Sequence, residues 1–250
     1  MKFKKTNNPL VQKYTDFIYG IHPIIELLAA KRRKIGAVYT VKPFVKAWDQ
    51  IKSLLPDYVP VHIVSRDVLT KMAGIVDHQG ILAYVAPFPY AKQMFAPEKH
   101  PFLLVLDGVQ DVRNLGAIIR SAYCAGVDGI ILSKRGGTLL TAAAIKASAG
   151  LSEHVDIFIG QTIQSILAEL QKKDYSLYLA TLGQGHNAIT VEYKQPLALV
   201  IGSEETGISS SVFKLGIRIL LPQRREDISY NASVAAGILL FLIGVKIQKI

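Results

Sequence analysis

The chain has 250 residues, half of them hydrophobic, and a formal net charge of +10. This length suffices for one or two domains with a sizeable core. The longest apolar run, residues 234–245, has 12 residues, whereas a membrane-spanning helix needs about 20, so no membrane crossing is expected.

The cysteine and histidine content argues against a metal protein. A single cysteine, Cys124, excludes an intramolecular disulfide and a multi-cysteine zinc site. It lies in an apolar stretch, which predicts a small buried residue. The six histidines are scattered, without the pairing of a helical metal site. We therefore expect no metal.

The positive charge is concentrated near the N-terminus. Residues 1–90 hold 13 Lys and Arg against 6 Asp and Glu, and residues 91–250 hold 16 against 13. A basic cluster such as residues 31–34 is usually solvated surface, but this asymmetry at a pI near 9.6 suggests a polyanionic partner, with nucleic acid as the leading candidate. No apolar segment follows the first basic residues, so a secretory signal is not expected and the protein is predicted to be cytoplasmic.

The first part of the chain alternates between helical and extended patterns. Residues 1–16 are interpreted as a basic tail and residues 17–86 as a small α/β domain. Within this domain the patterns predict a helix over 23–33, a strand over 37–41, a helix over 44–55, and strands over 59–64 and 81–86. Residues 87–101 contain four prolines and no periodicity, which is typical of a linker.

The second predicted domain covers residues 102–250. It opens with the continuous apolar run 102–106, which fits a strand buried on both faces of a parallel sheet. Further strands are predicted over 129–132, 155–159, 176–180, 197–201 and 218–221, and helices after 111 and over 142–150, 163–173, 209–215 and 231–246. Six strands alternating with helices indicate an open parallel sheet that binds ligands at the carboxyl ends of its strands.

Three polar segments follow strands of this sheet. Arg120 lies among apolar residues, where burial would be costly unless it binds an anion or forms a structural ion pair. Glu204 lies between Gly202 and Gly207, which suits either a close backbone approach to a ligand or a plain turn. The third segment places Ser229 and Asn231 at a helix start, where they could cap the helix or line a ligand site.

Three motifs in this order resemble those of the SpoU/TrmH family of RNA ribose methyltransferases. They are LDGVQDVRNLGAIIRSA from residue 106, LVIGSEETGI from residue 199 and LPQRREDISYNASVAAGILLF from residue 221. The stretches IYGIHPIIELL and VDHQGILAYV resemble the family's N-terminal substrate-binding module, so the likeness covers nearly the whole chain. The layout is most similar to members that methylate a guanosine of large-subunit (23S) ribosomal RNA.

The resemblance implies a specific fold, cofactor and partner. The catalytic domain would be a knotted (trefoil) parallel-sheet SPOUT methyltransferase domain, working as a homodimer in which the last helix supplies much of the interface. S-adenosyl-L-methionine would be the cofactor and RNA the substrate. The implied catalytic residues are Asn114, Arg120, Glu204, Ser229 and Asn231. The implied cofactor-binding residues are Thr181, Leu182, Gly183, Ile201, Gly202, Leu221, Tyr230 and Ala232.

Three alternatives remain open on the sequence. A transfer-RNA ribose methyltransferase of the same fold would use the same residues. A non-catalytic RNA-binding protein could keep the scaffold, because a fold does not fix a function. A nucleotide-dependent oxidoreductase is disfavoured, because no glycine fingerprint follows the first strand of the sheet.

Overall fold

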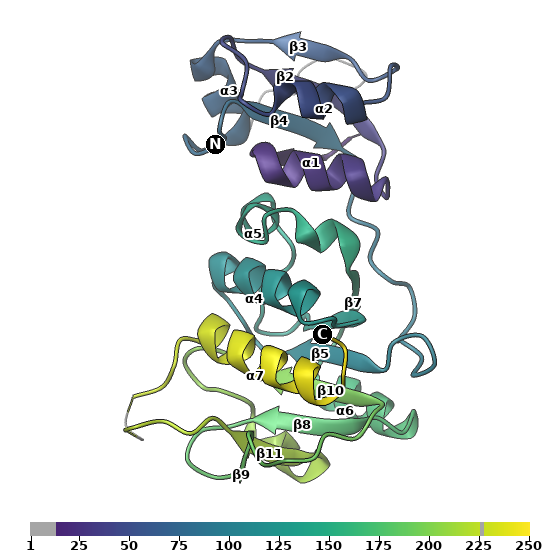
Figure 1. Ribbon diagram of the computed structural model, residues 1–250, viewed down its shortest axis with the longest axis vertical. Coiled ribbons are helices and arrows are strands. Elements are labelled where there is room, and N and C mark those ends of the chain that lie inside the picture. Colours follow the sequence, from purple (N-terminus) through teal and green to yellow (C-terminus); the bar gives the residue numbers. More distant parts are fainter. Residues whose placement is uncertain (1–13, 226–227) are drawn as a thin grey trace. The chain divides into compact units, whose positions relative to one another are not determined.

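The computed structural model describes residues 14–225 and 228–250, which form two compact units (Figure 1). The first unit takes in the described residues up to Pro89 together with Ala149–Glu153. The second takes in Tyr90–Ser148 and His154–Ile250. Of the predicted basic tail, residues 1–13 lie outside the described residues.

The first unit is built on a four-stranded mixed sheet in the order β1-β4-β2-β3. β1 and β2 pair antiparallel with β4, and β3 pairs parallel with β2. Its elements are β1 (Asp16–Tyr19), α1 (Ile21–Ala30), β2 (Ile35–Thr40), α2 (Trp48–Leu54), β3 (Val61–Ile63), α3 (Arg66–Ala73) and β4 (Ile81–Val85). The sequence predicted neither β1 nor α3. Half of the residues of α3 are polar, and the helix is started by the Ser65 hydroxyl, which accepts from the Val68 amide at 3.3 Å.

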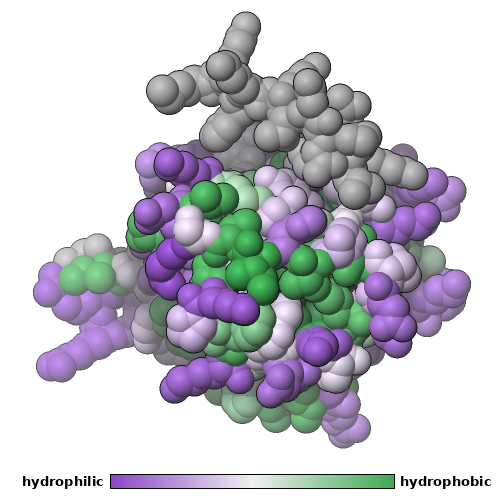
Figure 2. All heavy atoms as spheres, turned by 90° about the horizontal axis from the view of Figure 1, so that it is seen from above, coloured by the Kyte–Doolittle hydropathy of each residue, from purple (hydrophilic) through white to green (hydrophobic). Residues whose placement is uncertain are grey.

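The outer edge of this sheet is short and exposed. β3 has three residues, and all of them are exposed, including Val61 and Ile63. Figure 2, seen from above the view of Figure 1, shows apolar surface enclosed by hydrophilic side chains. A short edge of this kind limits unwanted pairing with other sheets.

Arg33 departs from the solvated basic cluster that the sequence suggests. Its side chain is 1% exposed. The guanidinium donates to the Ala86 carbonyl at 2.7 Å, to Glu153 Oε1 at 3.1 Å and to Asp16 Oδ2 at 3.1 Å. Two carboxylates and a carbonyl thus compensate its burial, as a buried charge requires.

The second unit is built on a seven-stranded sheet in the order β7-β6-β5-β10-β8-β11-β9, and every pairing in it is parallel. Its strands are β5 (Phe102–Leu106), β6 (Gly129–Ser133), β7 (Asp156–Gly160), β8 (Ser176–Ala180), β9 (His186–Asn187), β10 (Leu197–Ile201) and β11 (Ile217–Leu220). Its helices are α4 (Val112–Cys124), α5 (Ala142–Ala147), α6 (Ile163–Lys172) and α7 (Ala232–Lys246), with a 3-10 turn at Ser210–Leu215. A second 3-10 turn, Leu151–His154, belongs to the first unit up to Glu153. The predicted parallel α/β sheet is confirmed, with the two-residue β9 added.

Alternate residues of the central strands pack on opposite faces of the sheet. Leu103, Val105 and Val200 join a buried cluster with α6. α4 and α7 lie side by side in front of the sheet in Figure 1. All residues of β5, β6 and β10 are buried, as expected for strands covered on both faces.

α4 and α5 approach each other closely at Gly116. A Cβ there would lie 2.4 Å from the Ala144 carbonyl oxygen and 2.4 Å from the Ala147 side chain, so only glycine fits. The burial expected for Cys124 is wrong, because this residue is exposed at the end of α4. Among the described residues, no helix is long and apolar enough to cross a membrane.

Candidate functional site

The predicted cofactor-binding residues follow three neighbouring strands. Thr181–Gly183 follow β8, Ile201 ends β10 with Gly202 directly after it, and Leu221 follows β11. These strands are adjacent in the order β10-β8-β11 and are parallel, so their carboxyl ends meet at one edge of the sheet. The remaining two residues, Tyr230 and Ala232, lie at the start of α7.

Three of the predicted catalytic residues form one hydrogen-bonded cluster. Asn114 of α4 donates its amide to Glu204 Oε1 at 2.7 Å. Asn231, the N-cap of α7, donates its amide to Asn114 Oδ1 at 3.3 Å. Segments separated by 90 and 117 residues are therefore brought together at this sheet edge.

The start of α7 fixes the direction of this chain of hydrogen bonds. Asn231 Oδ1 accepts from the Ser233 and Val234 backbone amides at 2.9 and 3.4 Å, as an N-cap does. Its NH₂ group must then point at Asn114 Oδ1, which turns the Asn114 NH₂ group toward Glu204. The cap of α7 thereby orients the Glu204 carboxylate through Asn114.

Arg120 and Ser229 lie outside this cluster. Arg120 is exposed on α4, so it does not carry the cost of a buried charge. The neighbouring apolar residues Ile118 and Ile119 face inward, whereas position 120 falls on the outer side of the helix. It lies six residues beyond Asn114, or about 9 Å along the helix axis. Within the described residues neither Arg120 nor Ser229 makes a hydrogen bond or ion pair.

Glu204 is held on a tight loop that requires glycine at its base. A Cβ on Gly202 would lie 2.0 Å from the Gly207 carbonyl carbon. Ser203 and Gly207 exchange backbone hydrogen bonds at 3.2 and 3.0 Å. The Ser203 hydroxyl also accepts from the Thr206 amide at 3.1 Å. These contacts make residues 203–207 a rigid support for the carboxylate.

The cofactor-loop residues offer apolar surface and open backbone. Leu182 is 65% exposed and Tyr230 is 42% exposed, and Gly183 has φ +75°. The Thr181 hydroxyl donates to the Gln184 carbonyl at 2.7 Å, which closes this loop on itself. Exposed apolar side chains beside a glycine suit a flat ring system that packs against backbone.

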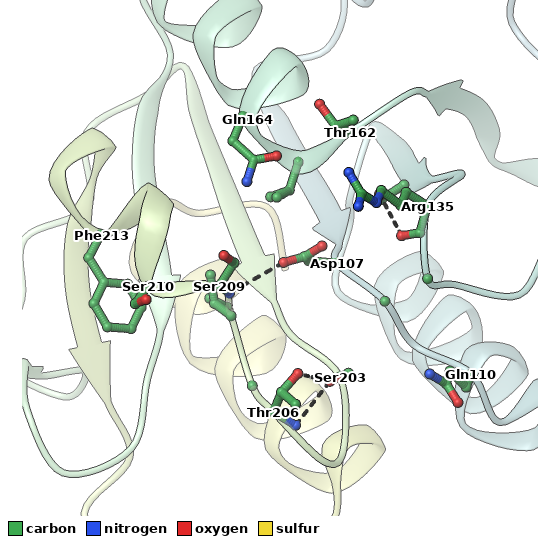
Figure 3. Close-up of a pocket in the computed structure, with 16 residues that line it drawn as sticks. Asp107, Gln110, Arg135, Thr162, Gln164, Ser203, Thr206, Ser209, Ser210 and Phe213 are labelled. Atoms are coloured by element: carbon green, nitrogen blue, oxygen red, sulfur yellow. Dashed lines mark hydrogen bonds between the residues drawn. The ribbon is translucent and has the colours of Figure 1, made fainter.

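A pocket of about 740 Å³ opens on the other half of the same sheet edge (Figure 3). It lies at the carboxyl ends of β5, β6, β7 and β10, where the strand order reverses, which is the general ligand position of such sheets. None of the predicted catalytic or cofactor-binding residues lines it. Its lining residues are Asp107, Gly108, Gln110, Ser133, Arg135, Gly136, Thr162, Ile163, Gln164, Ser203, Thr206, Gly207, Ile208, Ser209, Ser210 and Phe213.

Asp107 is the acidic group of this pocket. Its backbone amide donates to the Ile201 carbonyl at 2.8 Å, and its Oδ2 accepts from the Ser209 amide at 3.5 Å. Burial raises the pKa of the Asp107 carboxyl, and the Ser209 hydrogen bond opposes this only in part. Arg135 lines the same pocket without an ion pair to Asp107. The pocket thus offers a carboxylate and a guanidinium to one ligand.

The sequence interpretation missed this pocket for a definable reason. The predicted site residues all lie at the end of, or after, β5, β8, β10 or β11, and none follows β6 or β7. Arg135 follows β6 and Thr162 follows β7, so the rule of ligands at strand ends could have identified both. Asp107 follows β5 directly, but an Asp and a Gly after a strand are equally typical of a plain turn.

A row of aromatic rings crosses the sheet of the first unit. Phe17, Tyr84, Tyr39 and His62 come from all four strands. Successive ring centroids are 6.4, 5.7 and 4.9 Å apart, and the last pair is stacked. Rings on a sheet are a common platform for stacking RNA bases. Within the described residues, no group of three metal-ligating side chains is found.

Comparison with known families gives two matches that together span most of the chain. Residues 101–241 match the SpoU rRNA Methylase family. Residues 17–91 match the family described as RNA 2′-O ribose methyltransferase substrate binding.

Individual relatives agree with these matches. The chain is 33% identical over 235 residues to the putative TrmH family tRNA/rRNA methyltransferase YacO of Bacillus subtilis (strain 168), covering 90% of this chain and 94% of that protein. The fold of the chain is similar to the crystal structure of an RNA 2′-O ribose methyltransferase, with a TM-score of 0.82 and 20% identity, covering 99% of this chain and 100% of that one. It is also similar to the SpoU methyltransferase AviRb from Streptomyces viridochromogenes in complex with the cofactor AdoMet, with a TM-score of 0.79, 17% identity and coverage of 98% and 95%.

Proposed function

The chain belongs to the SpoU rRNA Methylase family, and from this premise we propose that it transfers a methyl group from S-adenosylmethionine to a ribose 2′-hydroxyl of RNA. The observation that carries the proposal is the hydrogen-bonded cluster of Asn114, Glu204 and Asn231, built from three distant segments beside the cofactor loops. The resemblance of the motif layout favours a guanosine of large-subunit ribosomal RNA as the target.

The loops after β8, β10 and β11 suit the proposed cofactor. When bound, S-adenosylmethionine supplies a methyl carbon already activated by a positive sulfonium. Leu182 and Tyr230 would pack against its adenine, and Gly202 lets the loop backbone approach it. The knotted path that the family resemblance implies for this region stays a prediction.

The chain's own task is to position the ribose and to stabilise the oxygen as it loses its proton. The attacking hydroxyl must lie in line with the methyl carbon, and positioning of this kind can supply several kcal/mol. Glu204, oriented by Asn114 and Asn231, would accept a hydrogen bond from the ribose 2′-hydroxyl and take up its proton as the bond from this oxygen to the methyl carbon forms. Arg120 would bind the target phosphate and stabilise charge that develops on the oxygen. It would not act as the base, since a guanidinium stays protonated in proteins.

We also propose that two copies of the chain associate through α7. This helix is apolar all round, and Val234, Ile238, Phe241 and Val245 remain 41–63% exposed. Their spacing of four, three and four residues places them on one stripe. Because Arg120 faces outward on the adjacent α4, it would reach the Glu204 cluster of the second copy rather than its own.

The first unit would hold the RNA. Its family match, its aromatic row and the excess of basic residues in this part of the chain support RNA as the partner.

The experiment is a methyl-transfer assay with labelled S-adenosylmethionine on ribosomal and transfer RNA transcripts, alongside calorimetric titration with the cofactor. We expect cofactor binding and transfer to ribosomal RNA. Methylation of transfer RNA alone would identify the chain as a transfer-RNA ribose methyltransferase of the same fold. RNA binding without cofactor binding would identify a non-catalytic homologue and contradict the proposal.

A further inference from the structure

None of the residues proposed to act in methyl transfer lines the pocket of Figure 3, but one loop contributes to both sites. Ser203 and Thr206 line the pocket, while Glu204 between them joins the hydrogen-bonded cluster. A ligand in this pocket would therefore lie one loop away from the proposed reacting ribose. This distance suits another part of the same RNA substrate.

The polar groups of the pocket point into one space. In Figure 3 the Asp107 carboxylate, the Arg135 guanidinium and the Gln164 amide converge between β5 and the start of α6. Gln164 Nε2 donates to Ser211 Oγ at 2.8 Å, which orients its carbonyl oxygen. The site thus presents a fixed anion, a cation and an amide acceptor on different sides.

The remaining walls include apolar side chains. Ile163, Ile208 and Phe213 line the pocket, and Ile163 and Ile208 are at most 5% exposed. A ligand that matches this combination has a flat apolar face, N–H donors on one edge and a negative group. A nucleotide has all three features, whereas a free sugar lacks the flat face.

The Asp107 carboxylate favours one base over the others. Guanine alone among the four bases presents a ring N–H and an exocyclic NH₂ group side by side, so it can donate two parallel hydrogen bonds to a carboxylate. Uracil offers one ring N–H, and adenine and cytosine offer one exocyclic amino group. A phosphate on the same nucleotide would find the Arg135 guanidinium.

On these grounds we infer that the pocket at the carboxyl ends of β5, β6, β7 and β10 binds a guanine nucleotide of the RNA substrate. Asp107 would contact the edge of the base, and Arg135 would contact the phosphate. The inference rests on the proposed RNA methyl transfer. The cofactor is assigned elsewhere, because its proposed binding residues lie at or after the ends of β8, β10 and β11 or at the start of α7, and none of them lines this pocket. The pocket reads the base of an unstacked nucleotide, as sequence-specific RNA recognition commonly does.

The test is equilibrium titration of the full chain with guanosine 5′-monophosphate, inosine 5′-monophosphate and guanosine, followed by saturation-transfer NMR. Inosine lacks only the exocyclic amino group. We expect the guanine nucleotide to bind about tenfold more tightly than the inosine nucleotide. Asp107→Asn should abolish this preference. Arg135→Gln should weaken both nucleotides equally and leave guanosine, which has no phosphate, unaffected.

Two matched variants serve as controls. Lys134→Gln removes a neighbouring charge that does not line the pocket, and Glu205→Gln removes an exposed carboxylate on the adjacent loop. Both should bind as wild type does. Equal binding of the guanine and inosine nucleotides, or an unchanged preference in Asp107→Asn, overturns the inference. A loss of S-adenosylmethionine affinity in Asp107→Asn or Arg135→Gln also overturns it, because the pocket would then be the cofactor site.

Different results would contradict the pocket assignment and the proposed function. A wild-type chain that methylates RNA but shows no preference for the guanine nucleotide contradicts only the pocket assignment. A chain that shows the expected binding pattern but transfers no methyl group contradicts only the proposed reaction.

Discussion

Asp107 carries an electrostatic cost that its surroundings do not remove. Burial raises the pKa of its carboxyl in the folded chain above the ordinary value of 3.8. The unfolded chain therefore releases this proton at a lower pH than the folded chain does. The stability linked to Asp107 is fully present below the ordinary pKa and is lost as the pH rises through the raised one.

Asp107→Asn should therefore raise the melting temperature at pH 7.5, because the amide keeps an acceptor for the Ser209 amide without the buried charge. The gain should shrink as the pH is lowered toward about 4. Thermal unfolding across this pH range measures it, with the exposed Asp57→Asn as the control. A variant less stable than wild type at pH 7.5, or a difference independent of pH, would contradict the assignment.

Asn231 combines two tasks that substitution can separate. Asn231→Ala should lower the free energy of unfolding by about 1 kcal/mol, because the first amides of α7 lose their cap, and should also impair transfer. Asn231→Ser keeps a capping oxygen but has no amide to donate to Asn114. It should keep nearly wild-type stability in chemical denaturation while transfer falls about tenfold or more. Equal activity of the Ser variant and wild type would show that the Asn114 contact is not needed.

Continuous apolar runs predict the buried strands correctly, but apolar neighbours do not predict which side of a helix a residue lies on. The runs 102–106 and 197–201 are buried strands as predicted, because few other structures suit five consecutive apolar residues. Arg120 and Cys124 lie among equally apolar neighbours but face outward, since burial depends on rotation about the helix. β9 has two residues and forms only by pairing with β11, which a local pattern does not reveal.

The candidate site, too, could be predicted from the sequence only in part. The motifs mark Asn114, Glu204 and Asn231 as candidates, but the hydrogen-bond order among them depends on which helix amides Asn231 caps. The pocket draws its lining from four separate strand ends, and no single stretch of sequence marks it.

The exposed stripe on α7 gives a prediction at this scale. Phe241→Glu places a charge in the middle of the proposed interface and should convert a dimer to a monomer in sedimentation velocity. Val76→Glu changes an apolar residue of the first unit that is even more exposed, 73% against 63% for Phe241, and should leave the dimer intact. Identical sedimentation of both variants and wild type would rule out α7 as the interface.

The positions of Arg120 and Glu204 predict that a working site needs two chains. Arg120→Ala and Glu204→Gln should each be inactive alone. Mixed in equal amounts after unfolding and refolding, they should recover about a quarter of wild-type transfer, because half the dimers are mixed and each has one complete site. If Arg120 served its own chain, mixing would restore nothing.

The most direct test maps the product. Ribosomal RNA incubated with the protein and S-adenosylmethionine is digested with alkali, which cannot cleave beside a methylated 2′-oxygen, and the resistant dinucleotide is identified by mass spectrometry. Wild type should yield one ribose-methylated dinucleotide, and Arg120→Ala should yield none while binding S-adenosylmethionine as wild type does. A methyl group on a base, or equal loss of cofactor binding and transfer in Arg120→Ala, would contradict the account.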